Sequence, residues 1–84
     1  MRLPIIKHTV DFIENNDEDW VKETIELLEH MAEAKGIKDE ELDVMGELLS
    51  NFEGALEVHK AMKEGKDRKT AMNDFMQRVM GSIN

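Results

Sequence analysis

Three histidines are the side chains of this sequence best suited to acid–base chemistry or metal binding near neutral pH. His8, His30 and His59 are far apart in the chain, and there is no cysteine. A dinuclear metal site in a helical bundle needs Glu three residues before His, but Leu27 and Leu56 hold those positions. No nucleophilic triad or Gly-rich phosphate loop can be assembled. The sequence therefore predicts no catalytic residue, no metal and no cofactor.

An acidic segment near residue 15 imitates part of a calcium-binding loop. Asn15, Asp17, Asp19 and Glu26 fall at positions 1, 3, 5 and 12 of an EF-hand. Position 6 of such a loop must be glycine because the chain turns sharply there, and here it is Trp20. The segment is better interpreted as the acidic start of a helix.

A basic segment follows residue 59 and forms a candidate patch for an anion or partner: Lys60, Lys63, Lys66, Arg68 and Lys69. Residues 1–59 carry 16 acids and 5 bases, whereas residues 60–84 carry 3 acids and 6 bases. The second interpretation is that these bases compensate the acidic body, within one chain or between two. The net charge of −8 disfavours nucleic acid and anionic membrane as partners.

Apolar periodicity places these side chains on helices. It predicts an all-α fold of four helices, at about 4–15, 18–35, 40–64 and 68–81, in a single domain of residues 1–84. Gly36 and Gly65 follow expected helix ends, and Asp39 and Asp67 are expected to cap the third and fourth helices. In the second helix we expect an inward face made of Trp20, Val21, Thr24, Ile25, Leu28, Met31 and Ala32.

The segment 39–64 carries more apolar surface than one neighbouring helix can cover. At helical spacing, its apolar positions sweep roughly 200°, against the ~100° stripe of an ordinary surface helix. We therefore expect this helix to be central, and a small bundle to be completed by a second copy. The residues predicted for that interface are Leu42, Met45, Leu49, Phe52, Leu56 and His59, with Met72, Phe75 and Val79 nearby.

Small residues recur every four positions in the same segment, at Gly46, Ser50 and Gly54. Each glycine costs about 1 kcal/mol relative to alanine inside a helix. Such a ridge fits a close crossing by another helix, or it is simply an exposed face on which the glycines are tolerated. The sequence leaves both interpretations open.

The size of the chain also favours self-association. With 84 residues, a domain buries only about 60–65% of its unfolded surface, and no disulfide can add stability. No stretch reaches the ~18–20 apolar residues of a membrane span, and residues 1–10 do not fit a secretory signal. We expect a soluble, cytoplasmic protein.

The chain resembles a family of short, acidic, uncharacterised proteins from Bacteroidota. The resembling stretches are Leu3-Pro4 with Ile6-Lys7-His8, EELDVMGELLSN, GALEVHK and FMQRVMGSI. Residues 42–84 are also similar, more weakly, to the YejL-like small proteins, through Asn51, Ala71, Phe75 and the closing Ser82-Ile83-Asn84. This second resemblance implies an all-helical dimer, although the chain has a longer, Lys-rich hairpin. Neither resemblance implies an activity.

The function expected from these observations is a non-enzymatic protein–protein interaction or scaffolding module that acts as a homodimer. One alternative is an acidic regulatory adaptor that binds a basic protein partner. The other is a small-ligand or enzymatic protein, which would need a deep pocket that holds His59 with a carboxylate.

Overall fold

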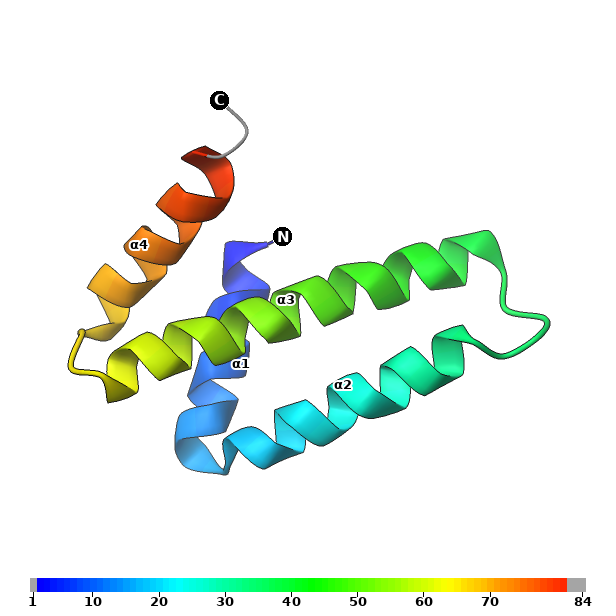
Figure 1. Ribbon diagram of the computed structural model, residues 1–84, viewed down its shortest axis with the longest axis horizontal. Coiled ribbons are helices and arrows are strands. Elements are labelled where there is room, and N and C mark those ends of the chain that lie inside the picture. The colour runs from blue at the N-terminus through cyan, green and yellow to red at the C-terminus, as the bar shows by residue number, and fades with distance from the viewer. Residues whose placement is uncertain (1, 82–84) are drawn as a thin grey trace.

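The computed structural model describes residues 2–81 and contains four helices (Figure 1). They are α1 (Leu3–Asn15), α2 (Glu18–Ala32), α3 (Asp39–Lys63) and α4 (Arg68–Gly81). The described residues include no strand. The predicted all-α class and the number of helices are therefore confirmed.

The helix starts follow local hydrogen-bonding chemistry, with one difference from the prediction. Asp67 caps α4, as expected, because its carboxylate accepts a hydrogen bond from the backbone N–H of Thr70 at 3.3 Å. The first residue outside α3, however, is Lys38. Its backbone N–H donates to the carboxylate of Glu41 at 3.0 Å, which is half of a capping box. The predicted cap at Asp39 was wrong by one residue, since Asp39 already lies in the helix.

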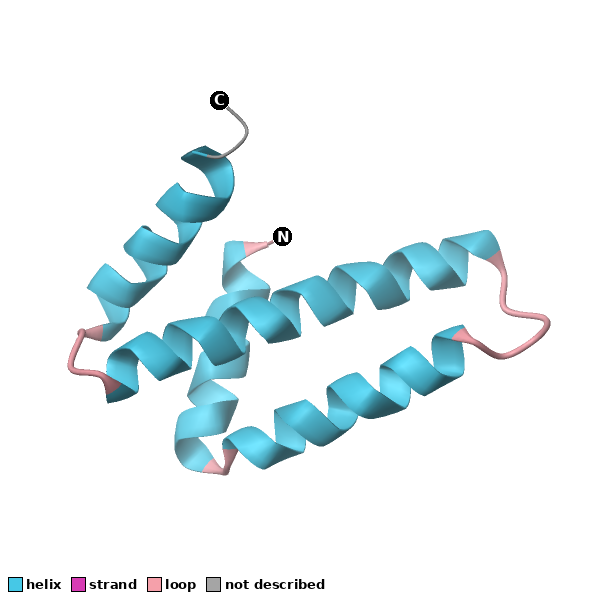
Figure 2. Ribbon diagram, in the orientation of Figure 1, coloured by secondary structure: helices cyan, strands magenta, loops and turns pink. Residues whose placement is uncertain are grey.

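The helices are joined by short connections (Figure 2). Gly36 has a φ of +88° and Gly65 a φ of +112°, and glycine adopts this left-handed conformation without steric cost. Both were predicted to end a helix, and both lie just beyond one. α2 ends at Ala32, earlier than the predicted residue 35, because residues 33–36 already form turns.

α3 is the central helix, as predicted from its wide apolar face. It contacts α1, α2 and α4, while α1 also contacts α2. α2 and α3 form an antiparallel hairpin, α4 lies on the other side of α3, and α1 crosses behind α3 (Figure 1). The shortest dimension is 17 Å, which fits two layers of helices packed 8–10 Å apart.

The core is small and lies where α1, α2 and α4 meet α3. Among the described residues, ten apolar ones are buried: Ile6, Val10, Ile13, Val21, Ile25, Ala55, Val58, Ala71, Met72 and Phe75. The molecule is correspondingly open, with a radius of gyration of 13.8 Å where a compact domain of this length has about 12 Å. No described helix is long and apolar enough to cross a membrane.

Candidate interaction surface

The residues predicted for a dimer contact occupy three different environments. Leu49, Phe52, Leu56 and Val79 are half-buried against the core, Met45 is half-buried, and Leu42 is exposed. Met72 and Phe75 are buried inside the chain, between α4 and α3. Those two side chains already have partners within the chain, so they are not available to a second copy. The interface itself stays a prediction.

The ridge of small residues on α3 has two unlike ends. At Gly54, which is buried, a Cβ atom would lie 2.8 Å from Cζ of Phe75 and 3.5 Å from Cδ1 of Ile6. At Gly46 a Cβ atom would meet nothing within 4 Å. The close crossing therefore exists at Gly54 and is made within the chain by α4 and α1, whereas Gly46 lies on an open face.

Among the described residues, Asn51 is the only polar one that is buried, and its side chain joins two helices. Its Oδ1 accepts a hydrogen bond from the backbone N–H of Arg2 at 2.8 Å, and its Nδ2 donates to the carbonyl of Glu47 at 2.7 Å. The Arg2 N–H lies at the start of α1, where helical N–H groups have no partner within the helix. Asn51 therefore fixes where α1 begins on α3, a role that the sequence analysis did not predict.

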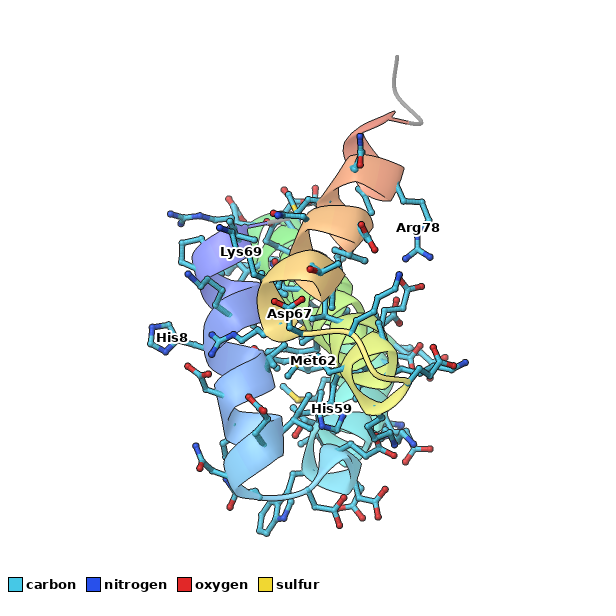
Figure 3. The ribbon with its side chains drawn as sticks, turned by 90° about the vertical axis from the view of Figure 1, so that its left-hand side faces the viewer. His8, His59, Met62, Asp67, Lys69 and Arg78 are labelled. Atoms are coloured by element: carbon cyan, nitrogen blue, oxygen red, sulfur yellow. The ribbon has the colours of Figure 1, made fainter. Side chains whose placement is uncertain are left out.

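His59 faces α2 within its own chain. Its Nδ1 lies 3.6 Å from Oε2 of Glu18, and the Nζ of Lys63 lies 3.2 Å from the same oxygen. Figure 3 shows His59 and Met62 between the helices, whereas His8 points away from them on the outer side of α1. Hydrogen bonds from Lys63 and then Lys22 lower the pKa of Glu18. The cluster ties the start of α2 to the end of α3.

The basic segment is largely paired with acids of the same chain. Lys63 pairs with Glu18, as above, and Lys66 pairs with Asp74 at 2.7 Å. Arg68 pairs with Asp11 of α1, and it also donates to the carbonyl of Lys7 at 3.2 Å. Three of the five bases thus pair with carboxylates of the same chain. These contacts favour the interpretation that the basic segment compensates the acidic charge of its own chain, rather than the interpretation that it binds an anion.

The exposed face of α2 differs from the prediction. Trp20, Thr24, Leu27 and Met31 follow one another at spacings of four, three and four, so they form one stripe along the helix. Trp20 is 61%, Leu27 58% and Met31 39% exposed, and Thr24 is exposed. The prediction that Trp20, Thr24 and Met31 face inward was therefore wrong. The residues of α2 that are buried, Val21 and Ile25, lie on the stripe next to this one.

A matching stripe runs along α3 at Val44, Leu48, Asn51, Ala55 and Val58. Its second half is covered, since Asn51 and Ala55 are 0% and Val58 is 1% exposed in the core that α1 helps to form. Its first half is not, because Val44 is 58% exposed and Leu48 is half-buried. α1 crosses only one part of the α2–α3 hairpin, which extends beyond it toward the 33–38 connection (Figure 1).

We call the uncovered part the hairpin face, defined by Leu27 and Met31 of α2 with Val44 and Leu48 of α3. Val44 and Leu48 continue the stripe that α1 covers, and Leu27 and Met31 continue the stripe that begins at Trp20 and Thr24. Trp20 and Thr24 line a groove shared with α1. Both pairs therefore lie on the side of the hairpin that α1 occupies.

That groove, of about 430 Å³, adjoins the hairpin face. Phe12 and Trp20 meet edge to face at its rim, with ring centroids 6.4 Å apart, and Phe52 also lines it. The hydroxyls of Thr9 and Thr24 are bonded to carbonyls of their own helices. Among the described residues, no cluster of His, Asp or Glu could hold a metal ion. The residues that line the groove are mostly apolar and therefore suit apolar contacts.

The described residues form a small all-helical protein with exposed apolar side chains on its α2–α3 hairpin. The family model described as "Family of unknown function (DUF6952)" matches residues 1–84, so the chain belongs to that family. No curated protein matches the chain, and no solved structure does.

Proposed function

We propose that this chain is a non-enzymatic protein–protein interaction or scaffolding module that acts as a homodimer. The observation that carries the proposal is the excess of accessible surface over that of a compact monomer. The chain exposes 6018 Å², whereas a folded monomer of 9.7 kDa exposes about 5,100 Å². The excess of roughly 900 Å² is close to the ~800 Å² that each partner contributes to a standard protein interface.

The kind of surface supports the same proposal. Large apolar side chains are left exposed on α1, α2 and α3, among them Phe12, Trp20, Leu27 and Val44. Contiguous exposed apolar surface rimmed by polar residues is typical of an interaction site. The weak resemblance of residues 42–84 to the YejL-like proteins, seen in the sequence alone, would also imply a helical dimer.

The proposal is tested by measuring the mass of the protein in solution. Size-exclusion chromatography with light scattering, repeated over a wide range of protein concentration, is expected to give twice the mass of 9.7 kDa. Circular dichroism on the same samples establishes that the protein is folded. A folded protein that remains monomeric at about 100 μM, where even weak dimers form, would contradict the homodimer.

A further inference from the structure

We propose that a second copy of the chain covers the hairpin face, with the two hairpin ends packed against each other about a two-fold axis. This inference rests on the proposed homodimer and adds which surface forms it. The contact predicted from the sequence ran along α3 from Leu42 to His59, whereas the hairpin face lies beyond α1, toward the 33–38 connection.

The first argument is the continuity of the covered and uncovered stripes. On α3, one line of residues passes from the α1-covered Val58, Ala55 and Asn51 to the uncovered Leu48 and Val44. The helix therefore presents the same kind of surface along its length, but its own chain supplies a cover for one half only. A packed neighbour is missing over the other half.

The second argument is the size of the uncovered part. The start of α1 lies against Asn51 of α3, which accepts a hydrogen bond from the backbone N–H of Arg2. Residues 39–50 of α3 therefore lie beyond α1. Twelve helical residues span about 18 Å. A two-fold axis near Met45, at the middle of this length, lays the segment against its own copy in antiparallel orientation. The same surface then serves both partners, as an isologous contact requires.

The third argument is charge. Such an axis brings the first turn of α3 in one copy next to the start of α1 in the other. The first turn of α3 is acidic, with Asp39, Glu40 and Glu41. The charged residues in the first half of α1 and its cap are Arg2 and Lys7, and the first turn has no acid. Opposite charges therefore meet at both ends of the symmetric contact.

The fourth argument distinguishes a second copy from another kind of occupant. Leu27 and Val44 are each 58% exposed, and apolar surface left open in this way favours aggregation unless it is covered throughout the life of the protein. Another copy of the chain is present wherever the chain is made. A basic amphipathic helix of a different protein could also contact the acidic first turn of α3, but it would cover the face only where that protein is present.

The decisive variants are Leu27→Glu and Val44→Glu. Both side chains are largely exposed in the single chain, so the isolated fold should tolerate the change. In the proposed dimer each glutamate would be buried against apolar residues, which is costly for a charge. We expect the dissociation constant to rise at least about 100-fold, with unchanged helical circular dichroism. Gln77→Glu is the control for the added charge, since Gln77 is exposed and lies on α4, on the other side of α3 from α2 (Figure 1).

A charge-reversal pair tests the orientation of the two copies. Arg2→Glu and Glu40→Arg are each expected to weaken the dimer about three- to tenfold, as changes of charge at an interface rim do. The double variant restores opposite charges across the two-fold contact, so we expect it to recover most of the wild-type affinity.

The results separate this inference from the proposed function. If the wild-type protein is a dimer and both glutamate variants bind as tightly as it does, the hairpin face is not the interface, although the homodimer stands. If Gln77→Glu weakens the dimer as much as they do, the surface is again wrong. A wild-type protein that stays monomeric overturns both proposals, whether or not a basic Leu/Lys helical peptide then binds and shifts the Trp20 fluorescence.

Discussion

Gly46 and Gly54 belong to the same helix but have opposite surroundings, and they make a matched pair of substitutions. A Cβ atom at Gly46 would meet nothing within 4 Å, so Gly46→Ala should stabilise the protein by about 1 kcal/mol through helix propensity. At Gly54 a Cβ atom would lie 2.8 Å from the Phe75 ring, which is itself buried. Gly54→Ala should therefore cost about 1–3 kcal/mol. Urea denaturation of both variants measures the two effects, and a stabilising Gly54→Ala would contradict the close crossing.

Asn51 gives a second prediction for a single residue. Removing its side chain leaves the N–H of Arg2 and the carbonyl of Glu47 without the hydrogen bonds at 2.8 and 2.7 Å. Asn51→Ala should lower the free energy of unfolding by about 1–3 kcal/mol, as the loss of a buried hydrogen-bond partner does. The exposed Asn73 provides the control, because Asn73→Ala should change stability by less than ~0.5 kcal/mol. Equal effects of the two substitutions would rule out the assigned role of Asn51.

The sequence did not reveal these residue roles, for a physical reason. Periodicity places Asn51 on the line between Leu48 and Ala55, but it cannot tell which backbone group arrives there from α1. The spacing of Gly46, Ser50 and Gly54 likewise indicates a smooth ridge without showing that α4 crosses only its last residue. Both facts depend on how distant segments meet in space.

At the scale of helices, the pairing of α2 with α3 through Glu18 predicts a dependence of stability on pH. Hydrogen bonds from Lys63 and Lys22 lower the pKa of Glu18 in the folded protein. Its contribution is fully present above the ordinary glutamate pKa of about 4.3 and is lost as the pH falls through the lowered folded value. Denaturation midpoints should therefore fall less between pH 7 and acid pH in Glu18→Gln than in the wild type.

The control for that comparison is Glu26→Gln, at an exposed position of the same helix. This substitution leaves the pairs of Glu18 intact and should keep the acid sensitivity of the wild type. A Glu18→Gln variant with the same pH profile as the wild type would show that the link between α2 and α3 adds nothing.

Elements were easier to predict than their orientation. The apolar periodicity, together with Gly36, Gly65 and Asp67, predicted the positions of all four helices. The wide apolar face of the third helix predicted its central position. α2 was misjudged because its apolar residues cover two adjacent stripes, and a sequence alone does not tell which stripe the neighbours cover. Trp20 and Val21 have similar apolar character, yet Trp20 is 61% exposed and Val21 only 6%.

At the scale of the whole molecule, a homodimer makes thermal stability depend on protein concentration. Binding between folded chains stabilises them by mass action, so the thermal midpoint should rise as the concentration is raised. Calorimetry or circular dichroism at several concentrations measures this rise. Val44→Glu should remove it, whereas Gln77→Glu should preserve it, and a wild-type midpoint that does not vary would count against association.

The central position of α3 has a consequence for how disturbances travel through the molecule. Within the described residues, the backbones of α2 and α4 do not approach each other, and both pack on α3. A molecule that docks on one side can therefore influence the other by shifting α3, or through α1, which contacts α2 and is bonded to Arg68 of α4. Amide exchange in α4 would report such mechanical transmission, with Gly54 and Phe75 at the point of transfer.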